Sequence, residues 1–366
     1  MTTINANYDK VSPSYLFSEV VRRKKAFEAK TGIKVMNLGV GNTTEALTPT
    51  IIQGLRLGVN KLASRETYTG YGDEPGDERL RKAIAAEYSK RGVLIGQEEV
   101  FVSDGAKCDS ANIQSIFGLE SVVAVQDPAY PVYLDTNLIA GRKVVFMPCT
   151  KENRFIPGLP EPEEAIFEIP PRNEKVDLIY LCSPNNPTGA VIPKSRLQAF
   201  VDFTRKTKAA IIFDAAYSFF ISDPDLPRTI YEVEGAKECA IEISSFSKYA
   251  GFTGVRLGWT VVPKQMVVEG TEPGKINALW RRRQTTFFNG ASNIVQEGGL
   301  AALTQQGQQE CQSVINYYMR NARIIRDALQ AKGLAVYGGI NAPYLWMRTP
   351  NGMNSWEFFD KLLNEA

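Results

Sequence analysis

The sequence predicts an α/β protein built on a mostly parallel β-sheet that is covered by helices on both faces. Seven short apolar runs have the character of buried strands, at residues 100–103, 122–126, 143–147, 177–182, 209–213, 240–246 and 257–262. Helix-like stretches lie between several of them, at 106–117, 130–139 and 193–207. Apolar strands that alternate with helices are typical of parallel sheets buried on both faces. With 366 residues, the chain is long enough for about two domains.

The segment before the first of these strands is expected to begin with a helix. Ser12 and Pro13 suit a helix start, the helical pattern runs to Lys30, and Gly32 is a good stop signal. The other elements expected here are a short strand, a polar loop and a charged helix, at 35–42, 64–76 and 77–91.

The chain after about residue 265 is expected to be mostly helical. Its strongest signals are a long helix at 308–332, two short strands at 334–337 and 343–348, and a helix at 354–366. The last helix starts at Asn354 or Ser355 and reaches the end of the sequence without a Gly or Pro stop signal. We therefore expect a truncated C-terminus.

The composition excludes several classes of partner and enzyme. Lys and Arg number 42 against 40 Asp and Glu, and this balance argues against a nucleic-acid or membrane-surface partner. The chain has no histidine, which rules out Ser-His-Asp catalysis and every histidine-ligated metal site. The five cysteines form no C-x-x-C pair, so we expect a reduced, cytoplasmic protein without a metal. No apolar run approaches the ~18 residues of a membrane span.

A lysine and an arginine follow the 240–246 run in the segment SSFSKYAGFTGVR, residues 244–256. Lysine is the side chain that forms Schiff bases, and burial or a nearby cation lowers its pKa so that the neutral amine is available. Lys248 comes three residues after Ser245, and Arg256 is eight residues further on. Hydroxyls and an arginine at this spacing suit a phosphate group. Taken alone, the pattern is more often a surface lysine in a glycine-rich loop.

Two other strand ends carry polar groups that suit a planar ring. Asp214 ends the run IIFD, and Tyr217 follows three residues later. A buried carboxylate needs a partner such as a protonated pyridine nitrogen, although an aspartate here could instead cap the next helix. Asn186 lies in SPNNPTG (183–189), at the sheet edge where open α/β sheets bind ligands. The alternative for this segment is an ordinary Asn-Pro turn.

The first strand ends offer an anion site and an aromatic ring. In SDGAKCDSAN (103–112), Gly105 allows a turn and a helix begins at Ala106, where free N–H groups favour an anion. A plain strand–Gly–helix connection is about as frequent. Tyr130, in DPAYPVY (127–133), could stack on a ring. Together these strand ends match the needs of a phosphorylated pyridine aldehyde, which indicates pyridoxal 5'-phosphate as the cofactor.

These motifs, in this order, resemble the fold type I pyridoxal-phosphate aminotransferases over essentially the whole chain. The resemblance implies a large domain with a mostly parallel seven-stranded sheet and a smaller α/β domain made from the two chain ends. The implied boundaries are an N-terminal arm with part of the small domain at 1–45, the cofactor-binding domain at 46–290 and the small C-terminal domain at 291–366. Within the family, five stretches resemble the LL-diaminopimelate aminotransferases: YDKVSPSYLFSEV, NLGVGNTTEALTP, YTGYGDEPGDERLR, FVSDGAKCDSANIQSIFG and GFTGVRLGWTVVPK.

The resemblance implies a role for each matching residue. Lys248 would form the Schiff base (aldimine) with the cofactor and move a proton at the substrate α-carbon. Asp214 would pair with the pyridine N–H, Tyr217 and Asn186 would bond the ring hydroxyl, and Tyr130 would stack on the ring. The phosphate would be held by Tyr71 from a partner chain together with Ala106, Lys107, Ser245, Ser247 and Arg256. The positions implied around the substrate are Tyr15, Gly41, Glu74, Lys107, Tyr130, Asn186 and Asn289.

The implied activity is reversible amino transfer between LL-2,6-diaminopimelate and 2-oxoglutarate, in lysine and peptidoglycan-precursor synthesis. The partners expected are amino-acid and 2-oxo-acid substrates and a second copy of the chain, in a homodimer with shared active sites. Members of the family bind the substrate α-carboxylate with an arginine near the C-terminus. Arg348 does not match that motif, so we assign this role to no residue of the chain. The alternative is another fold type I aminotransferase, or a carbon–sulfur lyase, of different amino-acid specificity.

Overall fold

The computed structural model describes residues 2–11, 15–39, 41–158 and 175–365. Its centre is a seven-stranded sheet of strand order β1-β7-β6-β5-β4-β2-β3, and a two-stranded sheet pairs β8 with β9. The strands are β1 (Val100–Ser103), β2 (Val123–Asp127), β3 (Val144–Pro148), β4 (Leu178–Cys182), β5 (Ala210–Asp214), β6 (Ala240–Ser245), β7 (Gly258–Val261), β8 (Val336–Gly338) and β9 (Leu345–Met347). All seven strands predicted for the large sheet are therefore confirmed.

The predicted helices are also present, with small changes at their ends. The α-helices are α1 (Leu16–Thr31), α2 (Pro49–Asn60), α3 (Glu78–Ser89), α4 (Ala106–Asn112), α5 (Pro131–Ile139), α6 (Lys194–Thr207), α7 (Phe246–Tyr249), α8 (Lys275–Phe287), α9 (Asn293–Leu303), α10 (Gln305–Ala331) and α11 (Ser355–Glu365). The helix predicted over 106–117 continues beyond Asn112 only as a 3-10 turn, Ile113–Ile116. Gly32 ends α1 in the left-handed conformation with a φ of 72°, as predicted. The predicted helix start at Ser12 and Pro13 lies outside the described residues.

The large sheet is parallel except where β7 inserts between β1 and β6. β7 runs antiparallel to both neighbours, so β1 and β6 point in the same direction. The pairs β6–β5, β5–β4, β4–β2 and β2–β3 are all parallel. The carboxyl ends of six strands consequently meet at one edge of the sheet, which is where open α/β sheets bind ligands.

Alternate residues along the strands of the large sheet face two separate apolar cores. On β4, Ile179 and Leu181 belong to the core that includes residues of α3 and α6. Leu178 and Tyr180 face the opposite core, which includes residues of α4, α5 and α8. Helices therefore cover both faces of the sheet, as the continuous apolar strands predict.

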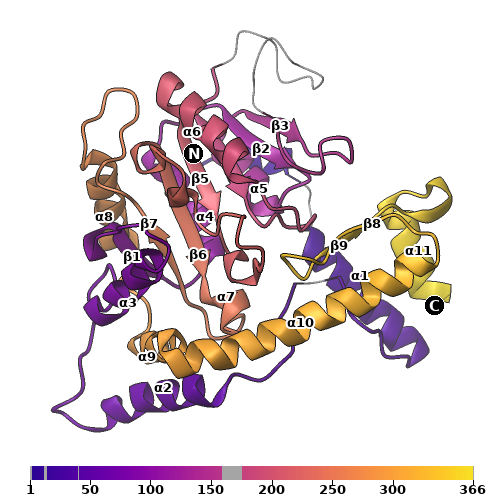
Figure 1. Cartoon of the computed structure of the whole chain (residues 1–366), viewed down its shortest axis with the longest axis horizontal. Coiled ribbons are helices and arrows are strands. Elements are labelled where there is room, and N and C mark those ends of the chain that lie inside the picture. The colour runs from indigo at the N-terminus through magenta and orange to yellow at the C-terminus, as the bar shows by residue number, and fades with distance from the viewer. Residues whose placement is uncertain (1, 12–14, 40, 159–174, 366) are drawn as a thin grey trace.

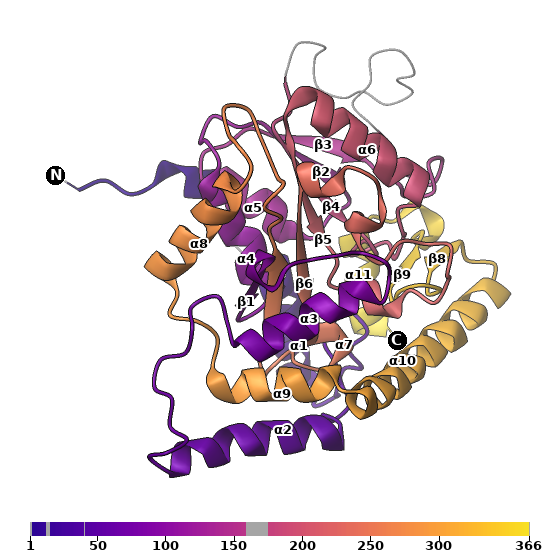
Figure 2. The same cartoon turned by 60° about the vertical axis from the view of Figure 1, so that its left-hand side comes forward.

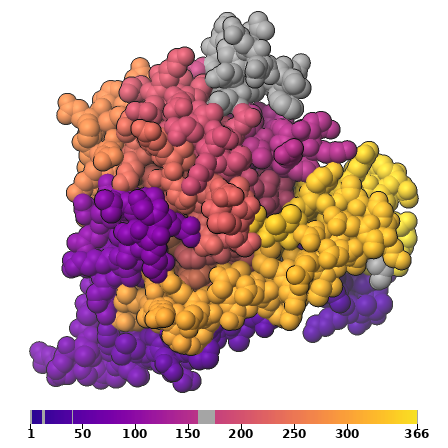
Figure 3. Space-filling view, in the orientation of Figure 1, coloured from indigo at the N-terminus to yellow at the C-terminus, as the bar shows by residue number. Residues whose placement is uncertain are grey.

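Helices α1 and α11, one from near each end of the chain, lie beside each other at one end of the molecule (Figures 1 and 3). Nη1 of Arg23 on α1 lies 2.9 Å from Oδ1 of Asp360 on α11, and the Arg23 guanidinium lies 4.4 Å from the Trp356 ring centroid. At the opposite end, α2 packs along α9 (Figure 2). The division into domains at residues 45 and 290 stays a prediction.

The strand predicted at 35–42 is absent from the described residues of that segment. Met36 and Leu38 are 83% and 71% exposed, so this apolar stretch packs against no sheet. An apolar run predicts a strand only if a neighbour supplies the ladder of hydrogen bonds, and none of the described strands runs beside it. Among the described residues, no helix is both long and apolar enough to cross a membrane.

Candidate active site

Asp214 ends the central strand β5 at the ligand-binding edge of the sheet. Its carboxylate is buried, Oδ2 accepts a 2.7 Å hydrogen bond from the hydroxyl of Tyr133, and Oδ1 accepts a 2.9 Å bond from the backbone N of Ala216. Burial raises the pKa of Asp214 above its ordinary value, while these two donors and the charge of Lys248 lower it. A cation on the open side of this carboxylate would stabilise its charged form.

Lys248 lies in the single turn α7, directly after β6. Its Nζ donates a hydrogen bond to the backbone O of Gly41 and lies 5.6 Å from the ring centroid of Tyr217. Burial, and to a smaller extent the charge of Arg256, lowers the pKa of Lys248 to about 8, while the charge of Asp214 acts in the opposite direction. A substantial share of the amine is therefore neutral near pH 8, as a Schiff-base lysine requires.

An anion-binding corner forms where α4, β6 and β7 meet. Arg256 has a φ of 72°, and its Nη1 donates to Oγ of Ser247 at 3.3 Å and to the backbone O of Thr253 at 3.1 Å. Ser245 is buried, and its Oγ accepts a 3.0 Å bond from the backbone N of Ser247. These contacts bring together the hydroxyls and the guanidinium that the sequence predicts for a phosphate.

Two glycines let the start of α4 reach this corner. A Cβ atom at Gly258 would lie 2.9 Å from the backbone N of Ala106, closer than real Cβ atoms approach. A Cβ at Gly105, whose φ is 135°, would collide with the guanidinium of Arg256. Only glycine at both positions allows the free N–H groups of α4 and Arg256 to share one space.

Aromatic side chains line the side of the site near α5. The Tyr130 ring meets the Tyr133 ring edge-on, with centroids 5.8 Å apart. Phe17 bridges Tyr15 and Tyr130, with centroid distances of 5.6 Å and 6.3 Å. Nζ of Lys107 lies 4.3 Å over the Tyr15 ring. The N-terminal segment thus places Tyr15 beside Lys107 and Tyr130, as expected for residues near a substrate.

The two asparagines that follow β4, Asn185 and Asn186, differ in burial and in hydrogen bonding. Asn185 is fully buried, and its Nδ2 donates to the backbone O of Pro128 and to Oγ1 of Thr188, both at 3.1 Å. Asn186 is only partly buried, and its side chain has no hydrogen-bond partner among the described residues. Asn186 is therefore available for a ligand, whereas Asn185 fixes the turn.

Tyr344 is a site residue that the sequence does not reveal. It lies between β8 and β9, and its hydroxyl hydrogen-bonds the hydroxyl of Tyr217, with ring centroids 4.9 Å apart. A Cβ at Gly41 would lie 2.6 Å from the Tyr344 hydroxyl and 3.0 Å from that of Tyr217. Glycine is therefore the residue type that fits at position 41 without displacing this tyrosine pair.

Tyr71, Glu74 and Asn289 lie apart from this set. All three are exposed, Tyr71 by 86%. Among the described residues, no hydrogen bond or ring contact joins any of them to Lys248, Asp214 or the anion-binding corner. They do lie in neighbouring segments, because a Cβ at Gly290 would be 3.0 Å from the backbone O of Asp73.

The residues present fit pyridoxal phosphate. The edge offers a lysine with a lowered pKa, a buried carboxylate for a ring nitrogen, and an arginine with hydroxyls for a phosphate. Each group needs the others nearby to serve one ligand, and the contacts of Lys248 with Tyr217 and the charge effects of Arg256 and Asp214 on Lys248 show that they are neighbours.

Comparisons with known proteins agree with this site. The family model "Aminotransferase class I and II" matches residues 33–366. LL-diaminopimelate aminotransferase from Chlamydomonas reinhardtii is similar with 44% identity and a TM-score of 0.90, over 99% of this chain and 88% of that chain. Substrate-bound BacF from Bacillus subtilis has 27% identity and a TM-score of 0.84, over 99% and 87%. An aromatic aminotransferase from Pyrococcus horikoshii, at 24% identity and a TM-score of 0.78 over 95% and 87%, shares the fold. The chain belongs to the class I and II aminotransferases, enzymes of fold type I that depend on pyridoxal phosphate.

Proposed function

We propose that this aminotransferase moves an amino group between LL-2,6-diaminopimelate and 2-oxoglutarate. In the biosynthetic direction, L-tetrahydrodipicolinate and glutamate give LL-diaminopimelate and 2-oxoglutarate, a step of lysine and peptidoglycan-precursor synthesis. The main observation in support of this substrate is Glu74, an exposed carboxylate in the same glycine-rich loop as Tyr71. Diaminopimelate differs from most amino donors by a second ammonium group, which needs such a carboxylate. The 44% identity to the Chlamydomonas enzyme supports the same choice.

The cofactor supplies, when bound, the electron sink for the charge left on the substrate α-carbon. Lys248 would attach the cofactor and then move the proton at that carbon, because its amine is buried and partly neutral. Asp214 would hold a proton on the ring nitrogen, since its buried carboxylate gains from a cationic partner. Amino transfer exchanges an amine on one carbon for a keto oxygen on another, so it needs no further oxidant or reductant.

The remaining residues would orient the ring and the phosphate. Tyr217 and Asn186 would donate to the ring hydroxyl, and Tyr130 would stack on the ring. The phosphate would be bound by Ala106, Lys107, Ser245, Ser247 and Arg256. The substrate would be contacted in the same chain by Tyr15, Gly41 and Lys107.

The proposal includes a homodimer with shared active sites. Tyr71, Glu74 and Asn289 are exposed, and within the described ranges no hydrogen bond, ion pair or ring contact joins them to the candidate residues around Lys248. These three side chains can fulfil their assigned roles if they reach the active site of a second copy of the chain. Tyr71 would then contact the cofactor phosphate and Glu74 the distal ammonium of the substrate. A cytoplasmic location is proposed as well, because the five cysteines are free thiols.

A panel of amino donors tests the substrate. The purified enzyme, loaded with pyridoxal phosphate, is assayed with 2-oxoglutarate and LL-diaminopimelate, aromatic, branched-chain or sulfur-containing amino acids. We expect LL-diaminopimelate to have the highest kcat/KM, by at least about tenfold, the lower end of what different contacts in a binding pocket discriminate. A higher kcat/KM for another donor, or release of a thiol from a sulfur-containing one, would overturn the proposal.

A further inference from the structure

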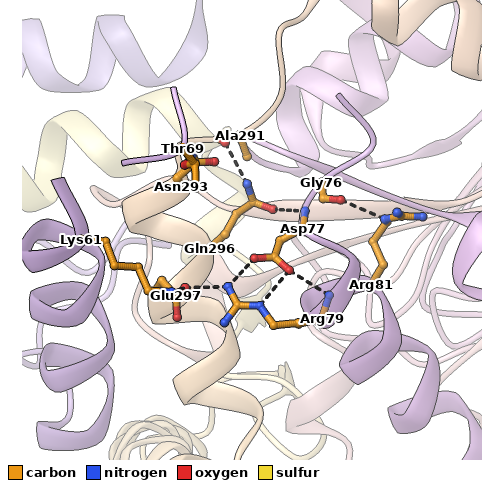
Figure 4. A network of polar contacts seen from close by, with 10 residues as sticks. All are labelled: Lys61, Thr69, Gly76, Asp77, Arg79, Arg81, Ala291, Asn293, Gln296 and Glu297. Carbon is orange, nitrogen blue, oxygen red and sulfur yellow. Dashed lines mark hydrogen bonds and ion pairs between the residues drawn. The ribbon is translucent and has the colours of Figure 1, made fainter. Parts of the chain in front are cut away.

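One buried amide side chain joins the two exposed segments that carry Tyr71, Glu74 and Asn289. Gln296, on α9, is 2% exposed. Its Oε1 accepts a 2.7 Å hydrogen bond from the backbone N of Asp77, and its Nε2 donates a 2.9 Å bond to the backbone O of Ala291. The first bond holds the segment 69–77 and the second holds the segment 288–291, so both are fixed to one helix (Figure 4).

Asn293, at the start of the same helix, holds the other end of the segment 69–77. Its Nδ2 donates to Oγ1 of Thr69 at 2.9 Å and to the backbone O of Gly70 at 3.0 Å. A Cβ at Gly72 would lie 2.5 Å from Oδ1 of Asn293, so the backbone packs directly on this side chain. Tyr71 and Glu74 therefore lie between two anchors on α9.

Further contacts tie the end of this segment to the large sheet. Nε of Arg81 donates a 2.9 Å bond to the backbone O of Gly76, and the backbone N of Val102 on β1 donates a 2.8 Å bond to the backbone O of Pro75. Nη2 of Arg79 donates a 2.6 Å bond to Oε1 of Glu297, which follows Gln296 on α9 (Figure 4). The loop is thus ordered by the chain that carries it, although Tyr71 and Glu74 themselves are exposed.

We propose that Gln296 and Asn293 are positioning residues, which fix Tyr71, Glu74 and Asn289 as one preformed unit that enters the active site of the partner subunit. The inference rests on the proposed function for what these three side chains contact. A segment that must be ordered during binding reduces affinity, and a segment that is already ordered does not. Loss of the Gln296 amide would leave the partly buried N–H of Asp77 and the buried C=O of Ala291 without these partners, which loosens both segments.

The test uses Gln296→Met, which keeps the side-chain volume, and Asn293→Ala, which changes a less buried position. The matched control is Gln284→Met, because Gln284 on α8 is 3% exposed and its Nε2 has no hydrogen-bond partner among the described residues. Hydrogen–deuterium exchange of the holoenzyme follows the amides of residues 69–77. We expect exchange about tenfold faster in the two anchor variants and unchanged in the control.

Binding measurements then connect the anchors to the site. We expect both variants to raise the dissociation constant of pyridoxal phosphate and the KM for LL-diaminopimelate by about tenfold, with kcat within about threefold of wild type. Wild-type exchange at 69–77 in both variants would overturn the proposal. Faster exchange with unchanged cofactor affinity and KM would overturn it as well.

The two proposals can fail separately. If the wild-type enzyme does not use LL-diaminopimelate, the proposed function fails, and exchange together with cofactor affinity still decides the role of the anchors. If Gln296→Met does not fold by circular dichroism, Asn293→Ala gives the same comparisons at a position that is only partly buried.

Discussion

The hydroxyl of Tyr133, on α5, donates a 2.7 Å hydrogen bond to Oδ2 of Asp214, the last residue of β5. Burial alone would favour the protonated acid, and this bond favours the charged form. Tyr133 therefore helps to keep Asp214 ionised, which is the state that a protonated ring nitrogen requires.

Replacement of Tyr133 should reduce turnover through its effect on the Asp214 carboxylate. Tyr133→Phe removes one donor, so the pKa of Asp214 rises and kcat should fall about tenfold, whereas Asp214→Asn should lower kcat at least ~100-fold. Both are measured at saturating cofactor and substrate. Tyr180→Phe is the matched control, because its hydroxyl bonds the backbone O of Ser110 at 3.2 Å and not Asp214. A kcat for Tyr133→Phe within twofold of wild type would contradict the relationship.

Lys248→Met should abolish turnover and stabilise the cofactor-free protein in a pH-dependent way. The pKa of Lys248 is lowered to about 8 from 10.5, so the folded protein binds its proton less tightly than the unfolded chain. This cost is fully present below pH 8 and disappears as the pH rises towards 10.5. The pKa difference corresponds to about 3 kcal/mol at 1.36 kcal/mol per pH unit, less the lost bond to Gly41.

Denaturant unfolding of the cofactor-free wild type and Lys248→Met at pH 7 and pH 10 measures this difference. The variant should gain in free energy of unfolding at pH 7 and lose most of that gain at pH 10. An equal gain at both values would show that the effect comes from packing and not from protonation.

Glu74→Gln should change specificity more than overall activity. If Glu74 binds the distal ammonium, the amide weakens transition-state binding of LL-diaminopimelate by ~2–5 kcal/mol, the cost of an unpaired charge, and leaves glutamate nearly unaffected. The ratio of the two kcat/KM values is the readout. Asp73→Asn makes the same charge change one residue earlier and should leave the ratio at its wild-type value. Equal losses for both substrates would count against the assignment.

Two inactive variants should complement each other if the sites are shared. In a mixed dimer of Lys248→Ala and Tyr71→Phe, one site receives both intact residues. Random exchange of subunits then restores about a quarter of the wild-type activity. Activity is measured after the two proteins are mixed, partly unfolded and refolded. Activity no higher than the sum of the separate variants, or a fully active monomer in light scattering, would refute the shared site.

Gly41→Ala should impair catalysis through a clash with the tyrosine pair. The new methyl group would press on the hydroxyls of Tyr344 and Tyr217, at 2.6 Å and 3.0 Å. We expect kcat/KM to fall at least tenfold, in line with the ~1–3 kcal/mol cost of overpacking. Removal of the nearer oxygen in Tyr344→Phe should relieve part of the loss, so the double variant should be better than additive. Strict additivity would mean that the pair does not control this space.

The sheet and much of the site follow from local patterns in the sequence. Apolar runs indicate the strands, and parallel strands bring their carboxyl ends to one edge of the sheet. The sequence alone therefore predicts that Asp214, Asn186 and Lys248 lie at the same edge. Each of these residues lies within a few positions of the strand that places it. The sequence pattern marks the Asn185–Asn186 pair, and the family resemblance singles out Asn186; the structure shows that Asn185 is the one used by the turn.

The features that the sequence did not reveal depend on contacts between distant segments. Tyr344 meets Tyr217 across 127 residues of chain, and no motif around it resembles a cofactor site. Tyr133 meets Asp214 across 81 residues, and its role depends on the face that α5 turns to the sheet. The absent strand at 35–42 has the same origin, because an apolar run carries no information on whether a pairing partner exists.

The position of β7 between β1 and β6 has a consequence for biosynthesis. Ser103 on β1 pairs with Gly258, and Gly258 also pairs with Ser245 on β6. The start of α4 and the hydroxyls after β6 therefore come together only through a strand made more than 150 residues after β1. A growing chain that leaves the ribosome N-terminus first cannot assemble the anion-binding corner until β7 has emerged. Binding of the cofactor phosphate at this corner therefore requires all seven strands of the sheet, so a nascent chain that lacks β7 cannot hold the vitamin-derived cofactor there.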